Sequence, residues 1–180
     1  MTQHEYVFVA ISIILGLAIT RLLHSVATLI RAHKRVEFHW ATATWGLCVM
    51  AYVLQFWWVG WGLRGVEAWN FLDFSVLTVG AIFVYGAAEM ALPVPDGDYA
   101  LDFLSHSQGL GRLSALSMLL YFAIGPYINI FLFGNDILAS VALPLLGMVL
   151  MMLIIVRAAW FKSLSVLFAA YSMTILYLTT

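Results

Sequence analysis

The chain has 180 residues, of which 64% are hydrophobic and 9% charged, whereas soluble domains carry about 25% charged residues. This composition excludes an ordinary soluble domain and favours a polytopic membrane protein. A net charge of −1 gives no support for a nucleic-acid partner. The single cysteine, Cys48, excludes an internal disulfide and a cysteine-based metal site.

Six apolar segments are long enough to cross a bilayer as helices, which takes about 20 residues each. Polar breaks divide the chain into the spans 6–30, 39–62, 70–92, 113–133, 137–156 and 161–179. We therefore predict an all-α fold, with residues 1–180 forming a single bundle of six transmembrane helices. The N-terminus lacks the positively charged start of a signal peptide, and the first apolar segment is longer than the apolar region of such a peptide. We therefore expect this segment to be a retained helix.

Positive charge predicts the orientation of these spans, because short loops rich in Lys and Arg stay on the cytoplasmic side. The second and fourth breaks hold only Arg64. The first, third and fifth breaks hold six cationic residues: Arg31, Lys34, Arg35, Arg112, Arg157 and Lys162. Both termini are therefore expected on the outer side. The cluster Arg31, Lys34 and Arg35 is also a candidate contact for anionic lipid head groups.

An arginine interrupts the first apolar segment. Arg21 precedes Arg31 by ten residues, which places it about 15 Å inside the membrane boundary. An unpaired arginine at such a depth costs about 2.5–3.5 kcal/mol on insertion scales. Escape towards the inner surface is difficult because helical side chains lean towards the N-terminus, here the outer side. Arg21 therefore requires a partner within the bundle.

Glu89 in the third span is the acid at the most compatible depth, since that span runs in the same direction and ends near Pro93. His24 follows Arg21 by three residues, so both are expected on one helix face, with His24 bridging to the carboxylate. The cluster Arg21, His24 and Glu89 has two interpretations. It either lines a path for protons or small ions, or forms a salt bridge that fixes one helix to another.

Weaker polar signals lie in the second and third spans and in the break that follows. Gln55 lies mid-span and is expected to form a hydrogen bond between helices. Asp73 lies near the outer end of its span, where a surface charge cluster explains it. Residues 99–106 are compatible with either a short surface helix or a solvated loop.

Two prolines fall at matching depths in the fourth and fifth spans. Pro126 lies eight residues before Gly134, and Pro144 lies eight residues after Asp136, so both are about 12 Å below the outer surface. Proline kinks a helix by removing a backbone hydrogen bond. Matched interruptions mark binding sites in some transporters, so Pro126, Asn129 and Pro144 form a second candidate site. Ordinary kinks among packed helices are the alternative.

Cofactor and catalytic motifs are sparse. Four histidines fall on the predicted cytoplasmic half, namely His24, His33, His39 and His106. A haem would need two axial ligands deep in the bundle, and only His24 is clearly deep. We therefore expect no cofactor and no metal, with haem kept as a testable option. Catalytic and nucleotide-binding signatures are absent from the sequence, so we do not expect an enzyme.

Three stretches carry a resemblance to other proteins: ILGLAITRLLH (residues 14–24), QFWWVGWGLR (55–64) and WNFLDF (69–74). In these stretches the first half of the chain resembles a group of uncharacterised small multi-pass proteins predicted from bacterial genomes. The resemblance implies a bacterial inner-membrane location. It implies no activity, ligand or catalytic residue.

Together these features predict a small channel- or transporter-like protein that moves protons or small ions through its polar cluster. The main alternative is a non-catalytic structural or accessory subunit of a larger membrane complex, in which the same charges only lock helices. A haem-binding electron-transfer protein is the third option. Beside the lipid bilayer, we expect a second copy of the chain or another membrane subunit as partner, because six helices with short loops form a small unit.

Overall fold

The computed structural model describes residues 2–66, 68–94 and 101–179, and for Leu101 only the backbone. Six long helices make up most of it, and each is long and apolar enough to cross a membrane. They are α1 (Gln3–Arg31), α2 (Trp40–Gly62), α3 (Phe71–Met90), α5 (Gly111–Tyr127), α6 (Ile137–Val156) and α7 (Phe161–Thr179). The prediction of an all-α chain with six potential membrane-spanning helices is confirmed.

Local sequence explains where the helices begin. Thr2 and Glu5 form a capping box at the start of α1, and Asn70 and Asp73 form another at the start of α3. Asp136 accepts a hydrogen bond from the backbone N–H of Leu138 and so caps α6. These caps satisfy backbone donors that have no partner within the first helical turn.

The ends of the helices differ from the predicted spans by a few residues. The third predicted span runs to residue 92, but α3 ends at Met90, three residues before Pro93. The fourth runs to residue 133, but α5 gives way after Pro126 to a π-helical turn, η3 (Ile128–Leu132). The missing N–H of a proline interrupts regular helical hydrogen bonding, which explains the change of helix type.

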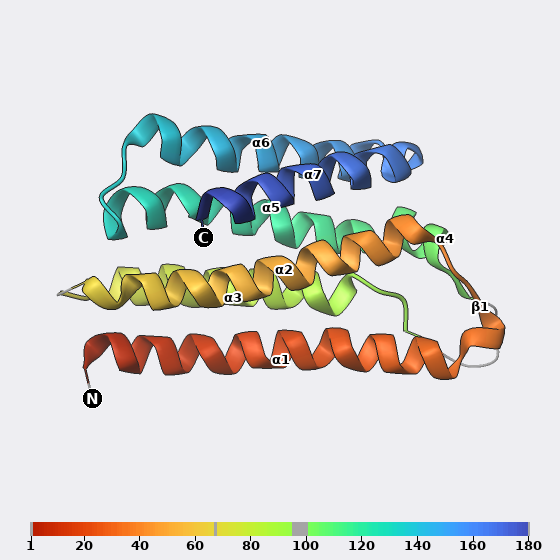
Figure 1. The fold of residues 1–180 in the computed structure, drawn as a ribbon, viewed down its shortest axis with the longest axis horizontal. Helices are drawn as coiled ribbons and strands as arrows, with labels where there is room; N and C mark the ends of the chain where they lie inside the picture. The colour runs from red at the N-terminus through yellow and green to blue at the C-terminus, as the bar shows by residue number, and fades with distance from the viewer. Residues whose placement is uncertain (1, 67, 95–100, 180) are drawn as a thin grey trace.

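The six helices form a closed ring of neighbours. Helix α1 contacts α2 and α3, α3 contacts α5, α5 contacts α6, and α7 closes the ring by contacting α6 and α2. Helices α1 and α6 therefore lie at opposite edges of the bundle (Figure 1). Large aromatic side chains are buried in the core, among them Trp45, Tyr52, Phe56, Phe122 and Phe168. The ring of Tyr52 packs edge-on against Phe122, with centroids 5.2 Å apart. Aromatic packing thus fills the middle of the bundle.

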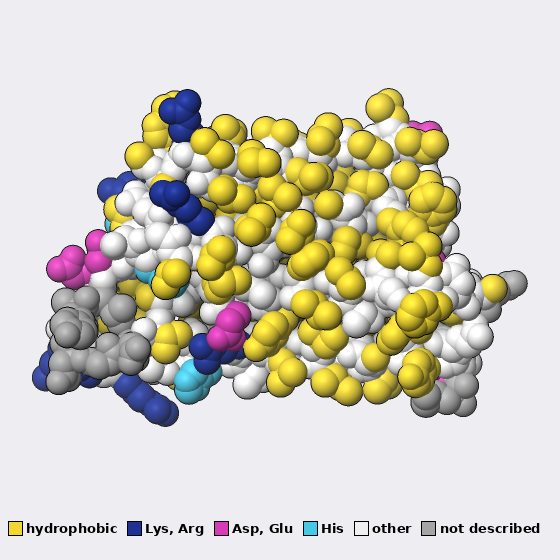
Figure 2. Space-filling model, turned by 180° about the vertical axis from the view of Figure 1, so that it is seen from behind, with side chains coloured by type: hydrophobic (Ala, Val, Ile, Leu, Met, Phe, Trp, Pro, Cys, Tyr) yellow, Lys and Arg dark blue, Asp and Glu magenta, His cyan; other side chains and the backbone are white. Residues whose placement is uncertain are grey.

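Both chain termini lie at the same end of the bundle, which we call the terminal end (Figure 1). The connections from α1 to α2, from α3 to α5 and from α6 to α7 lie at the opposite end. Figure 2 shows Lys and Arg side chains gathered towards this opposite end, while hydrophobic side chains cover the middle of the face. We call it the basic end. A charge asymmetry of this kind is typical of multi-pass membrane proteins.

Short elements occupy the connections. At the basic end they are η1 (His33–Arg35), β1 (Val36–Glu37), β2 (Leu101–Asp102), α4 (Phe103–Gln108) and η4 (Ala158–Trp160), and η2 (Leu63–Gly65) follows α2. Strands β1 and β2 pair in parallel, a contact that the sequence does not predict. Of the stretch 99–106, residues 99 and 100 lie outside the described part, and α4 provides the short helix that was one of its two expected forms.

Candidate functional site

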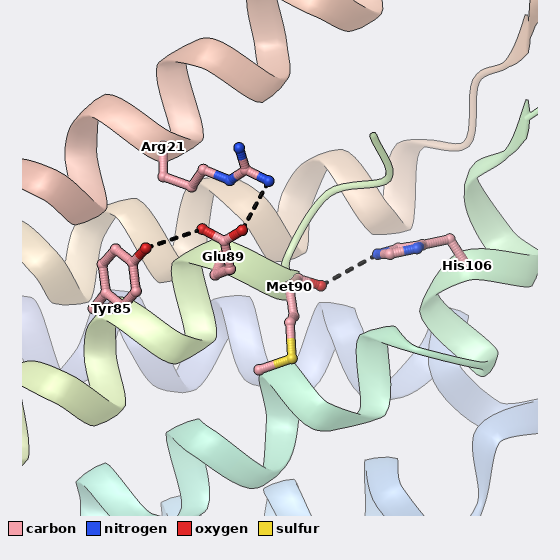
Figure 3. Close-up of polar contacts among 5 residues, drawn as sticks. All are labelled: Arg21, Tyr85, Glu89, Met90 and His106. Carbon is pink, nitrogen blue, oxygen red and sulfur yellow. Dashed lines mark hydrogen bonds and ion pairs between the residues drawn. The ribbon is translucent and has the colours of Figure 1, made fainter. Parts of the chain in front are cut away.

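Arg21 on α1 and Glu89 on α3 form a direct ion pair, with Arg21 Nη2 2.7 Å from Glu89 Oε1 (Figure 3). The helices α1 and α3 run in the same direction from the terminal end. Each of the two residues lies eighteen positions after the first residue of its helix. Equal positions along neighbouring parallel helices bring the side chains to one level. The predicted pairing of Arg21 with Glu89 is therefore confirmed.

Two further side chains complete this cluster. The hydroxyl of Tyr85, one turn before Glu89, donates to Glu89 Oε2 at 3.3 Å. His106 on α4 places Nε2 3.2 Å from the carbonyl oxygen of Met90, the last residue of α3 (Figure 3). That contact satisfies a carbonyl with no partner in its own helix. Burial lowers the pKa of His106, and the hydrogen bond to Met90 partly opposes this change. We call Arg21, Tyr85, Glu89 and His106 the charge cluster.

His24 does not take the bridging position that the sequence predicts. Its side chain is exposed, and among the described residues it makes no hydrogen bond or ion pair with Arg21 or Glu89. The expectation of a bridging histidine is therefore wrong. Besides Arg21, the group that contacts the Glu89 carboxylate is the hydroxyl of Tyr85. Tyr85 precedes Glu89 by four residues and so lies on the same helix face.

The charge cluster lies at the edge of the bundle, not in its centre. The side chains of Arg21 and Glu89 are 32% and 34% exposed, respectively. The Nε atom of Arg21 is buried and has no hydrogen-bond partner in the described part of the chain. Each charge nevertheless has an opposite charge at hydrogen-bond distance. Chemically, this arrangement neutralises Arg21 within an apolar region and ties α1 to α3.

The proline-containing segments of α5 and α6 meet on the other side of the bundle. A Cβ atom placed on Gly125 would lie 3.1 Å from Cγ of Pro144, so the proline ring of α6 sits directly against the backbone of α5 beside Pro126. Only glycine at position 125 permits this approach without displacement of the ring. The segments around Pro126 and Pro144 thus lie at one level of the bundle, as predicted, while their depth in a membrane stays a prediction.

A cavity of about 120 Å³ lies beside these bends. Asn129 and Pro144 line it, together with Tyr52 and Gln55 from α2 and Tyr171 from α7. We call it the kink cavity. A volume of this size has room for several water molecules or a small ion, since a single water needs only about 10–15 Å³ of such space. Sequence reasoning placed Asn129 and Pro144 here but gave no indication of the tyrosines.

The polar groups around the kink cavity differ in how well they are satisfied. Gln55 Nε2 donates to Thr179 Oγ1 at 3.1 Å, which confirms the expected bond between helices. The hydroxyl of Tyr171 donates to the carbonyl of Leu143 at 2.8 Å. The hydroxyl of Tyr52, a residue only 1% exposed, forms no hydrogen bond of good geometry among the described residues, and the side chain of Ser172 is a polar neighbour. A buried polar group of this kind is costly unless water or a ligand satisfies it.

Asp73 corrects another expectation. It is only 5% exposed, so it does not belong to a surface charge cluster. Its carboxylate accepts a hydrogen bond from the backbone N–H of Asn70 and another from the hydroxyl of Tyr127, at 2.7 Å. The second contact joins α3 to the bend of α5. The spacing of Asn70 and Asp73 signals the local capping box, but the contact with Tyr127 has no sequence signal.

The basic residues at the end of α1 and in η1 lie at the basic end of the bundle. Arg31 is the last residue of α1, Lys34 and Arg35 belong to η1, and all three are exposed. Their location at one end of an apolar bundle is compatible with anionic head groups. Contact with lipid remains a prediction.

Histidines near the basic end form local contacts. His39 Nδ1 accepts a hydrogen bond from the backbone N–H of Ala41 and caps α2, and His33 Nδ1 lies 3.1 Å from the carbonyl oxygen of Ile30. Within residues 2–66, 68–94 and 101–179, no group of three or more His, Cys, Asp or Glu side chains is placed to hold a metal ion.

Comparisons of the chain with protein-family models, with curated proteins and with solved structures found no match. The function of the chain is inferred from the two regions described above, the charge cluster near the basic end and the kink cavity towards the terminal end.

Proposed function

We propose that the chain is a small channel- or transporter-like membrane protein, and that protons or small ions occupy the kink cavity as they cross. The observation that carries this proposal is a cavity beside Pro144 and the π-helical end of α5, with neutral polar side chains, among them Tyr52 and Asn129, in its lining. Interrupted helices supply polar groups at membrane depth in many transporters. A π-helical turn beside the bend adds to this, since such turns occur frequently at functional sites.

The orientation and location belong to the same proposal. Most of the Lys and Arg residues lie in the breaks assigned to the basic end, so this end faces the cytoplasm and both termini lie outside. The kink cavity then opens in the outer half of the membrane. The bacterial inner membrane is the location that the resemblance of residues 14–24, 55–64 and 69–74 implies.

The charge cluster has a separate role in this proposal. Its arginine and glutamate already neutralise each other at 2.7 Å, so an ion passing between them would first have to separate the pair. Neither Arg21 nor Glu89 lines the kink cavity. The pair therefore holds α1 and α3 together, while conduction depends on the bends of α5 and α6.

Flux through proteoliposomes tests the proposal. Vesicles loaded with a pH-sensitive dye, or with a dye for Na⁺ or K⁺, should show faster flux with the purified full chain than without it. Asn129→Leu and Tyr52→Phe should each lower the rate by at least about fivefold, because each removes a polar group worth about 1 kcal/mol or more. His24→Gln is the matched control, since His24 is exposed and outside the cavity. Flux equal to that of empty vesicles for all ions and pH values contradicts the proposal.

A non-catalytic subunit of a larger membrane assembly is the second candidate. It is favoured by the aromatic side chains that fill the centre of the bundle and by the direct Arg21–Glu89 pair. About a third of each paired side chain is exposed at the bundle edge, and a second copy or another membrane subunit would cover this charge. Absence of flux, together with chemical cross-linking between copies or to a membrane partner, would favour this role.

A further inference from the structure

A second and larger cavity lies at the basic end, between the last turns of α1 and the first turns of α2. It exists because α3 ends at Met90, near the level of Arg21, whereas α1 continues to Arg31. Beyond the charge cluster, α1 therefore lacks α3 as a neighbour. The resulting groove has a volume of about 480 Å³, within the roughly 300–1,000 Å³ that is typical of ligand sites.

The walls of this groove are almost entirely apolar. Among the described residues that line it, His33 is the only one with a polar side chain. The two helices contribute Leu22, Val26 and Ile30 from α1, and Ala43, Leu47 and Met50 from α2. Leu47 is 71% exposed, so the groove is open along its side. Its occupant must therefore be apolar and must enter laterally.

Cationic side chains lie at one end of the groove. Arg31 and Lys34 are exposed and lie within two residues of His33 in the chain, and His33 Nε2 makes no hydrogen bond in the described part of the chain. The segment from Leu22 to Ile30 spans about 12 Å along the helix axis, so the apolar walls lead directly towards these cations. An apolar slot that ends at positive charge matches an amphiphile with an anionic head.

We infer that this groove binds an anionic phospholipid, with one acyl chain between α1 and α2 and its phosphate near Arg31, His33 and Lys34. The apolar walls provide area for the chain, and the cations select the head group by charge. This site is independent of the proposed ion path, because none of its lining residues lines the kink cavity. Failure of one proposal leaves the other intact.

Native mass spectrometry of the detergent-solubilised full chain tests this site. Phosphatidylglycerol and phosphatidylcholine with identical acyl chains are the probes. The wild-type chain should retain one phosphatidylglycerol with at least about fivefold preference, since one cation near an anionic head group corresponds to about that factor. The double variant Arg31→Gln with Lys34→Gln should lose the preference. Arg157→Gln with Lys162→Gln removes two other exposed cations of the basic end and should leave it unchanged.

A second variant tests the acyl-chain slot. Ala43→Trp places a large apolar side chain in the groove and should lower retention of both lipids by at least about fivefold. The surface charge variants need no repacking, so they remain informative if Ala43→Trp does not fold. Equal retention of the two lipids by the wild type overturns the proposal, as does equal loss in both charge-pair variants. A change of oligomeric state in folded Ala43→Trp, without loss of lipid, assigns the groove to a second copy and also overturns it.

Discussion

The two polar regions of the bundle are built in opposite ways. In the charge cluster, a full positive charge and a full negative charge meet at 2.7 Å, and a tyrosine hydroxyl takes the other carboxylate oxygen. In the kink cavity no charged side chain is present among the described lining residues, which include neutral polar side chains, and empty volume remains. The more highly charged region is paired, although the buried Nε of Arg21 has no partner among the described residues, whereas the neutral region retains empty volume.

This difference shows that charge alone does not identify the functional site of a membrane protein. A charged group within an apolar bundle raises the free energy of the folded protein, and direct pairing with an opposite charge reduces this penalty. Neutral polar groups around a void cost less, so they can remain unsatisfied until a ligand arrives. Pairing therefore indicates structure, and incomplete hydrogen bonding next to volume indicates binding. The following predictions test each half of this comparison.

Loss of the ion pair should have the largest effect. Glu89→Gln leaves Arg21 without a counter-charge and should lower the free energy of unfolding by about 2–3 kcal/mol, near the cost of an unpaired arginine on insertion scales. The partial exposure of both side chains keeps the value from being larger. Chemical denaturation in mild detergent measures it.

A double-mutant cycle separates pairing from other effects of these substitutions. Arg21→Gln with Glu89→Gln should recover part of the loss, because neither charge is then left alone. Glu37→Gln removes an exposed carboxylate of β1 and should change stability by less than about 0.5 kcal/mol. Strictly additive losses in the cycle would show that the two side chains do not stabilise the fold as a pair.

At the terminal end, the hydrogen bond from Tyr127 to Asp73 should contribute less. Tyr127→Phe removes a 2.7 Å bond to a buried carboxylate and should cost about 1–2 kcal/mol. It should also loosen the end of α5, because this bond links the last residue of α5 to α3. Tyr177→Phe alters an exposed tyrosine and serves as the control. An equal cost for both variants would contradict a specific role for Tyr127.

Sequence patterns predict the helices and one polar contact well, for identifiable reasons. Apolar length sets the spans, and two of them, 137–156 and 161–179, coincide with α6 and α7. Counting residues along two parallel helices is enough to match Arg21 with Glu89. The rotation of each helix is not available from such counting. Residues three apart differ by about 60° around the axis, and here that difference leaves His24 exposed.

Contacts between distant segments account for what the sequence could not predict. Asp73 is buried because Tyr127, 54 residues later, reaches it from α5. The groove at the basic end depends on α3 being shorter than α1, a difference that no local pattern connects with a cavity. His106 caps α3 from another helix in the same way. The position of a residue along its helix can be counted from the sequence. Its neighbours on other helices become known only from the packed bundle.

The contribution of His106 to stability should be the smallest, and it should depend on pH. Its pKa is lowered in the folded protein, so the unfolded chain binds the proton more readily. The contribution of neutral His106 is therefore complete above its ordinary pKa of 6.5 and is lost as the pH falls through the lower folded value. Between about pH 7.5 and about pH 5.5, Tm in detergent should fall by no more than about 4 °C.

A matched pair of histidine variants assigns this pH dependence. His106→Gln keeps a donor for the carbonyl of Met90 but does not titrate, so it should reduce the fall in Tm. His33→Gln changes an exposed histidine of the same end and should preserve it. A pH dependence that is identical in the wild type and in both variants would place the titrating group elsewhere.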